Sequence, residues 1–291
     1  MKREPAPSQA RLLIAATAVL FSTGGAVIKL ISLNAWQVAG FRAGIAAVVL
    51  AILSRRSLNV WNWRYLPVGA CYAATTILYV LANKLTTAAN AVFLQDTAPV
   101  ILLLLGPLFL KEPIRRADII FIAAMGCGMA LFFAAHEQVR ATAIDPLRGN
   151  IFAAASAVTW ALSVAGLRWL ARDDSKASGD VAPANTAMMS VIVGNLFAFI
   201  AALPLAFPVH FQSRDVAALL WLGIFQVGIA YVLLTRGIRR VPAFEATTIL
   251  LLEPALSPVW AWLVHGEAPS PLSITGGVII FGATLINSLR R

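Results

Sequence analysis

Ten apolar runs follow one another along the chain and constrain its fold more than any other feature. A run of about 18 or more apolar residues can cross the ~30 Å hydrocarbon core of a bilayer as a helix. The breaks between the runs are short and rich in turn-forming or charged residues. The runs fall at 11–31, 35–53, 65–84, 90–110, 117–135, 149–170, 184–207, 215–235, 244–264 and 272–289. The sequence therefore predicts an all-α polytopic membrane protein with ten transmembrane helices and no soluble domain.

Composition and charge support this prediction and orient the helices. Only 12% of the 291 residues are charged, against about 25% in soluble proteins, so the chain cannot cover a water-facing surface. With the N-terminus placed inside, seventeen of the 23 Lys and Arg residues fall at the inner helix ends. This bias predicts that both termini are cytoplasmic. It also explains the net charge of +10 without a nucleic-acid partner. The first apolar run is too long for a signal peptide and is expected to stay as an uncleaved helix.

The two halves of the chain resemble each other. Residues 84–119 align without a gap with a segment 155 positions later, and the first helix aligns with a segment 139 positions later. The aligned pairs include Pro99 with Pro254, Glu112 with Glu267, Phe21 with Trp160, and Lys29 with Arg168. Since each half holds five helices, an odd number, the halves must cross the membrane in opposite directions. We expect two inverted repeats, residues 1–136 with helices 1–5 and residues 149–291 with helices 6–10, the plan of many secondary transporters.

Two stretches carry a family resemblance. "AANAVFLQDTAPVILLLLGPLFLKEP" and "AFEATTILLLEPALSPVWAWLVHGEA" resemble the two EamA-type repeats of the drug/metabolite transporter superfamily, which have a mid-helix proline and end in Gly-Glu or a close variant. The resemblance covers essentially the whole chain, although Lys111 stands where glycine is usual. Within the superfamily, the chain is most similar to YddG-type bacterial exporters of aromatic and other amino acids. The resemblance implies a multi-pass protein of the bacterial inner membrane.

Two carboxylates lie inside apolar runs. Asp96 is in the fourth predicted helix and Glu253 in the ninth. A charge at the bilayer centre costs ~2.5–3.5 kcal/mol on insertion scales, so such residues normally face protein or water. Both are therefore candidates for binding a substrate ammonium group, and Lys29 and Arg42 are candidates for binding a carboxylate. The alternative for Asp96 is a structural ion pair with Lys84, Lys29 or Arg42.

Polar side chains recur at helical spacing and predict the wall of a cavity. The stripes are Tyr72, Thr76, Tyr79 and Asn83 in the third helix, Ser156, Trp160 and Ser163 in the sixth, and Glu253, Ser257 and Trp260 in the ninth. The alternative is that the aromatic members only pack. The predicted cavity residues are Tyr72, Tyr79, Asn83, Gln95, Asp96, Trp160, Ser163, Glu253, Lys29 and Arg42.

Pro99 and Pro254 occupy equivalent positions in the two halves. A proline frees the carbonyl four residues earlier from its helical hydrogen bond, and within a membrane that carbonyl must find a partner or line a wet cavity. The proline pair is predicted to form hinges for alternating access. The alternative is a static kink in each helix.

These features together predict a secondary transporter that exports aromatic and other neutral amino acids across the inner membrane by alternating access. The alternatives are export of nucleoside-like metabolites or amphipathic drugs, and a channel. An enzyme is not expected, because His136, His210 and His265 fall near outer helix ends without an HExxH motif. No GxxxxGK[ST] phosphate-binding loop is present, and no cofactor or metal is expected. The expected partners are the lipid bilayer and a small-molecule substrate.

Overall fold

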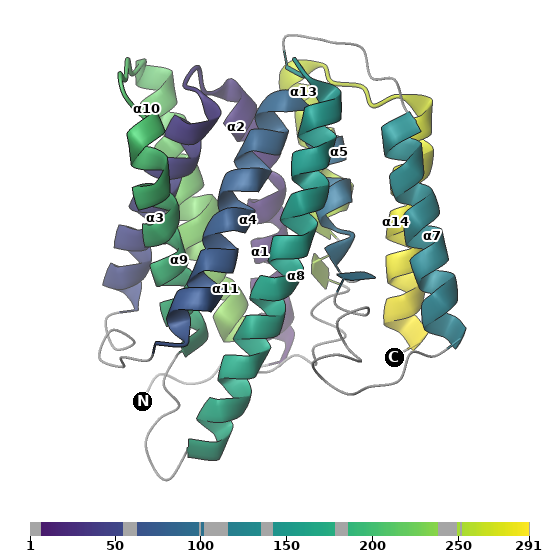
Figure 1. Ribbon diagram of the computed structural model, residues 1–291, viewed down its shortest axis with the longest axis horizontal. Helices are drawn as coiled ribbons and strands as arrows, with labels where there is room; N and C mark the ends of the chain where they lie inside the picture. The colour runs from purple at the N-terminus through teal and green to yellow at the C-terminus, as the bar shows by residue number, and fades with distance from the viewer. Residues whose placement is uncertain are drawn as a thin grey trace.

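A computed structural model describes residues 7–54, 63–98, 100–101, 116–134, 142–177, 186–237, 249–250 and 252–290. Helices make up nearly all of the regular structure in these ranges (Figure 1). They are α1 (Pro7–Ser22), α2 (Gly24–Leu30), α3 (Ala35–Leu53), α4 (Tyr65–Leu85), α5 (Ala88–Gln95), α7 (Arg116–Ala134), α8 (Pro146–Ala177), α9 (Thr186–Ala202), η2 (Leu203–Leu205), α10 (Ser213–Leu220), η3 (Trp221–Ile229), α11 (Ala230–Gly237), α13 (Leu252–His265) and α14 (Pro271–Arg290).

The helical segments have the length and composition of membrane spans. Six segments within the described ranges are long and apolar enough to cross a bilayer, and the shorter apolar helices Ile119–Leu131 and Pro271–Ile286 accompany them. The prediction of an all-helical polytopic membrane protein is confirmed. The predicted runs 90–110 and 244–264 lie partly outside the described residues.

Polar residues at the helix ends explain where several helices begin and stop. Asn34 and Gln37 cap α3 reciprocally, each side chain accepting from the other's backbone N–H at 2.9 Å. The Thr87 hydroxyl accepts from Asn90 N and caps α5. Just past the end of α13, Gly266 has φ of +65°, a left-handed conformation that glycine adopts without steric cost. These caps place short, tight turns at the ends of the apolar runs.

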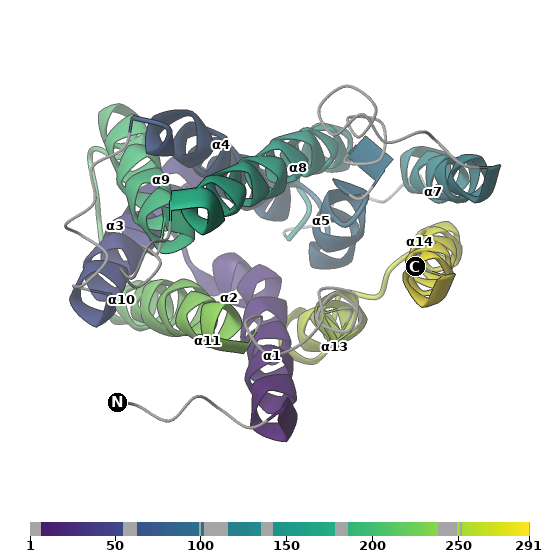
Figure 2. The ribbon, with the colours of Figure 1, turned by 90° about the horizontal axis from the view of Figure 1, so that it is seen from below.

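The helices pack in a pattern that is symmetric under exchange of the two halves. α4 packs on α8, and in the counterpart contact α1 packs on α11. The contact of α4 with α9 has its counterpart in that of α3 with η3. In the same way, the contact of α5 with α8 has its counterpart in that of α1 with α13. α3 pairs with α9, and α7 pairs with α14. Seen from below, the α7–α14 pair stands to one side of the other helices (Figure 2).

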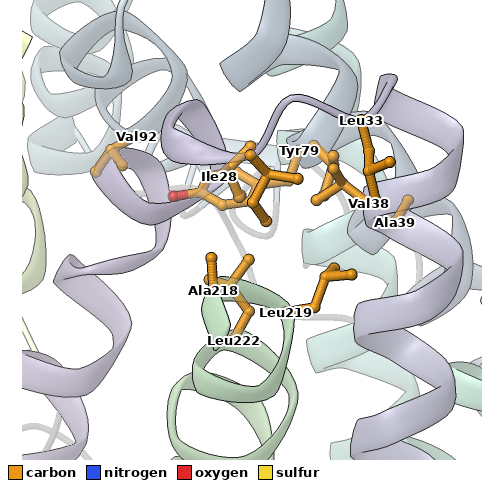
Figure 3. Close-up of a cluster of buried hydrophobic side chains, with 11 residues drawn as sticks. Ile28, Leu33, Val38, Ala39, Tyr79, Val92, Ala218, Leu219 and Leu222 are labelled. Carbon is orange, nitrogen blue, oxygen red and sulfur yellow. The ribbon is translucent and has the colours of Figure 1, made fainter. Parts of the chain in front are cut away.

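A buried apolar cluster joins the helices at one end of the bundle. It contains Ile28 from α2, Val38 from α3, Tyr79 from α4, Val92 from α5 and Leu222 from η3, together with their neighbours (Figure 3). Ile28, Val38 and Leu222 are fully buried. Because the cluster draws on both halves of the chain, it ties them together at this end, and Tyr79 also faces the cavity described below.

Three helices differ from the sequence prediction. The first run, 11–31, is interrupted at Thr23, which divides it into α1 and α2. The eighth run, 215–235, is built from α10, the π-helix η3 and α11. α8 continues to Ala177, through residues that the sequence predicts to be a linker. Its 32 residues correspond to about 48 Å, so this helix is longer than the ~30 Å hydrocarbon core.

Candidate functional site

A cavity of about 100 Å³ lies between the helices of the two halves. It is lined by Phe21, Arg42, Tyr72, Thr75, Thr76, Tyr79, Gln95, Asp96, Trp160, Gln226, Val227, Tyr231 and Glu253. Ligand pockets commonly measure about 300–1,000 Å³, so this conformation holds a narrow cavity. Five of these lining residues are aromatic, and the wall carries one cation and two carboxylates.

Irregular backbone gathers around the cavity. α5 ends at Gln95, and Asp96 and Thr97 lie in a turn in which Thr97 N donates to Leu94 O at 3.3 Å. This break follows from the sequence, because proline at position 99 has no N–H to donate to the Gln95 carbonyl. Phe21 precedes the break between α1 and α2, and Gln226 belongs to the π-helix. Within a membrane such breaks are tolerated where they line a cavity or are buried in protein.

Arg42 is the cation of the cavity wall and is only 3% exposed. Its Nη1 donates to Gln226 Oε1 at 3.4 Å, while its Nε has no hydrogen-bond partner in the part of the chain that the structure describes. No carboxylate among the described residues forms an ion pair with it. A buried guanidinium without a counter-charge is costly, and its planar array of donors suits a carboxylate. The arrangement can therefore accept an anionic group from a ligand.

Asp96 and Glu253 bring two carboxyl groups to the same cavity, from opposite halves of the chain. They are close enough for their charges to interact with one another. Asp96 Oδ2 is buried and has no hydrogen-bond partner within the described ranges, where the alternative ion pair of Asp96 with Lys84, Lys29 or Arg42 is also not found. A cationic group placed between the two carboxyls would be stabilised by both.

Aromatic rings line the same cavity as the charged side chains. The ring of Tyr231 lies 5.4 Å from that of Phe21 and 5.7 Å from that of Tyr72, centroid to centroid. The Tyr72 hydroxyl accepts from Asn195 Nδ2 at 3.3 Å, which fixes the tyrosine from outside the cavity. Trp160 reaches the cavity from α8. Rings held in this way can stack on a flat or apolar ligand group.

The structure brings seven of the ten sequence-predicted site residues together at the cavity, namely Arg42, Tyr72, Tyr79, Gln95, Asp96, Trp160 and Glu253. It places three elsewhere. Asn83 is buried and donates to Tyr79 O at 2.9 Å, and Ser163 is buried and donates to Thr159 O at 2.8 Å. Lys29 belongs to a separate cluster at the end of the bundle.

That cluster is a buried ion pair. Lys29 Nζ lies 2.9 Å from Glu267 Oε1, and the two side chains are 2% and 3% exposed. Lys29 also donates to the carbonyls of Thr86 and Thr142, and Glu267 Oε2 accepts from Ala88 N at 3.1 Å. These bonds join the end of α2, the start of α5, the segment before α8 and the turn after α13. The sequence suggests Lys29 as a ligand for a carboxylate, and the structure gives it an internal partner instead.

The sequence did not single out several lining residues, notably Gln226, Tyr231 and Phe21. Gln226 and Tyr231 are five positions apart, a spacing that an α-helix places about 140° apart. The i→i+5 bonding of η3 brings such residues toward one side. Phe21 did leave a signal, because the repeat alignment pairs it with Trp160, and both rings reach the cavity.

Of the two proposed hinge prolines, Pro99 lies outside the described residues. Pro254 is buried and is the third residue of α13, next to Glu253 of the cavity. Pro258 lies inside the same helix, at a position where the sequence predicts no hinge.

Known proteins resemble this chain over nearly its full length. An uncharacterized transporter of Archaeoglobus fulgidus is 25% identical, with 98% of this chain and 99% of that protein aligned. The pseudopaline exporter CntI of Pseudomonas aeruginosa is 24% identical, covering 94% of each chain. The uncharacterized transporter YwfM of Bacillus subtilis is 28% identical, covering 96% and 94%.

A structural comparison and a family comparison point in the same direction as these relatives. A solved structure, described only as the crystal structure of a protein, superposes with a TM-score of 0.64 at 21% identity and covers 97% of both chains, which supports the fold. The EamA-like transporter family matches residues 9–134 and 147–289. These matches cover most of the chain, and several of the relatives are named as transporters. The chain is therefore a multi-pass membrane protein that belongs to the EamA-like transporter family.

Proposed function

We propose that this protein is a secondary transporter, not an enzyme, that exports zwitterionic metabolites, foremost aromatic and other neutral amino acids. The observation that carries the proposal is the buried Arg42 guanidinium, which has no carboxylate partner among the described residues and faces a cavity that also contains Asp96 and Glu253. An amino acid carries one carboxylate and one ammonium group, which are the two charges that this wall complements. The aromatic side chains between them suit a neutral or aromatic side chain.

Transport follows from alternating access between two inverted halves, residues 1–136 and 149–291. The symmetric helix contacts support this division, because exchanging the halves preserves the main packing partners. The break at Asp96 and the buried Pro254 lie in the equivalent fourth and ninth helices, which are therefore the proposed hinges together with Pro99. The narrow cavity must widen to admit an amino acid, so this conformation is one stage of a cycle.

The proposed orientation in the inner membrane has both termini in the cytoplasm and the turn before α10 outside. Gln212, which is exposed next to α10, provides a position for testing it. In a variant without Cys71 and Cys127, Gln212→Cys is expected to react with an impermeant thiol reagent added to intact cells. The matched control is Ser54→Cys, at the C-terminal end of α3, which the proposed orientation places on the cytoplasmic side. It should react only after the cells are opened. The reverse pattern would contradict the orientation.

The substrate class is tested with purified protein in liposomes. Radiolabelled phenylalanine, threonine, a nucleoside and a cationic drug are compared, with and without a proton gradient. Saturable transport of phenylalanine and threonine above protein-free liposomes is expected, with little transport of the others. If the nucleoside or the drug is transported and the amino acids are not, the substrate class is wrong, although family membership stands.

Trp160 is expected to favour aromatic substrates. Stacking on a ring contributes ~0.5–1.5 kcal/mol beyond burial, so Trp160→Ala should lower kcat/KM for phenylalanine by about two- to tenfold more than for threonine. Trp262→Ala, which removes a ring that is 59% exposed on the surface of α13, is the matched control and should change neither. An equal loss for both substrates would show that Trp160 only packs.

A further inference from the structure

Gln226 reaches the cavity from an unusual backbone segment. It lies in η3, a π-helix of nine residues (Trp221–Ile229), and is only 6% exposed. π-helical turns are rare and are found frequently at functional sites. Leu222 and Val227 of the same π-helix are buried apolar residues, so Gln226 brings a polar side chain to the buried side of η3.

The Gln226 amide is held from two sides. On one side its Oε1 accepts from Arg42 Nη1 at 3.4 Å. On the other side it lies against Gly24, the first residue of α2, where an added Cβ would be 2.9 Å from Nε2 and 3.3 Å from Cδ. There is thus no room for a side chain at position 24 unless the amide moves. The contact connects the break in the first helix, through Gln226, to the cation of the cavity.

The charge of the side chain at position 226 decides whether Arg42 is available to a ligand. A carboxamide orients the guanidinium but leaves its positive charge uncompensated. A carboxylate of the same shape would form an ion pair with Arg42 and compensate its charge, which an amide oxygen cannot do. Such an internal partner would compete directly with a substrate carboxylate for the same donors.

We propose that Gln226 determines the substrate class of the cavity by holding Arg42 in place without neutralising it. The inference rests on the proposed function, because it assumes that Arg42 receives a substrate carboxylate. Gln226 is a positioning residue, acting through Arg42. With glutamate at this position, the cavity would keep Asp96 and Glu253 for an ammonium group but lose its place for a carboxylate. It would then prefer amines to amino acids.

The test compares phenylalanine with phenylethylamine, the same molecule without its carboxylate. Equilibrium binding to purified protein in detergent is measured with both radiolabelled ligands, because binding avoids the passive permeation of the amine through lipid. The wild-type protein should bind phenylalanine more tightly. In Gln226→Glu the Kd for phenylalanine should rise at least tenfold while that for phenylethylamine stays within about twofold or falls, which reverses the preference. Gln226→Met, neutral and of similar size, is the control and should weaken phenylalanine by only a few-fold without a reversal.

A second variant keeps the test informative if Gln226→Glu is not recovered as a folded protein. Gly24→Ala displaces the same amide from its other side without changing any charge, and it should raise the Kd for phenylalanine several-fold while leaving that for phenylethylamine unchanged. Two results would overturn the role of Gln226 while leaving the proposed function in place. They are an unchanged ratio of the two Kd values in Gln226→Glu, and an equal rise of both Kd values in Gly24→Ala. If the wild-type protein binds neither ligand, the proposed substrate class fails and this inference fails with it.

Discussion

Replacing Glu267 with alanine should destabilise the folded protein by about 3–5 kcal/mol. This is the cost of leaving one member of a buried ion pair without its partner. The Lys29 ammonium would keep the carbonyls of Thr86 and Thr142 but lose its only counter-charge among the described residues. The start of α5 would also lose the bond from Ala88 N. The measurement is the midpoint of thermal unfolding in detergent, obtained by size-exclusion chromatography of samples heated to different temperatures.

Two controls show whether the loss of stability arises because the ion pair is buried or simply because a charge is removed. Asp145 and Arg148 form an ion pair with side chains that are 37% and 76% exposed, so Arg148→Ala should cost no more than about 1 kcal/mol. The double variant Lys29→Met with Glu267→Met removes both charges together and should recover much of the stability lost by Glu267→Ala. If Glu267→Ala and Arg148→Ala have the same unfolding midpoint, the buried pair does not stabilise the fold as its geometry suggests.

Replacing Arg42 with alanine should lower kcat/KM for phenylalanine by about 10- to 150-fold. Hydrogen bonds to charged groups contribute about 1.5–3 kcal/mol, and 1.4 kcal/mol corresponds to a factor of ten. The protein should remain folded, because no carboxylate in the described ranges is paired with Arg42 and left without a partner by its removal. The measurement is initial transport rate in liposomes over a range of phenylalanine concentrations.

The conservative variant shows whether geometry or charge is responsible. Arg42→Lys keeps the positive charge but loses the planar fork of donors, so its kcat/KM should lie between those of the wild type and Arg42→Ala. Binding of phenylethylamine, which has no carboxylate, should change by less than about twofold in both variants. Loss of both ligands to the same extent would place Arg42 among the residues that only support the cavity.

The sequence predicted the fold better than the site, for physical reasons. Membrane spans follow from the length of apolar runs, which is a local property. The cavity residues Asp96 and Glu253 were also evident, because a carboxylate inside an apolar run is costly unless it faces protein or water. The role of Lys29 was not evident, since its partner Glu267 lies in the other half of the chain and becomes a neighbour only when the bundle is packed. Asn83 shares a helical stripe with Tyr79, but its amide turns back to the Tyr79 carbonyl.

The π-helix also shows how the substrate range of such a protein could change in evolution. Deleting a single residue of η3 that precedes Gln226 would allow this segment to return to α-helical bonding. Each residue of an α-helix turns the chain by about 100°, so two residues five positions apart lie about 140° apart around the helix axis. Gln226 and Tyr231, still five positions apart, could then no longer face the cavity together. The loss of one codon would thus alter two positions of the binding wall at once, a larger step in specificity than a point mutation provides.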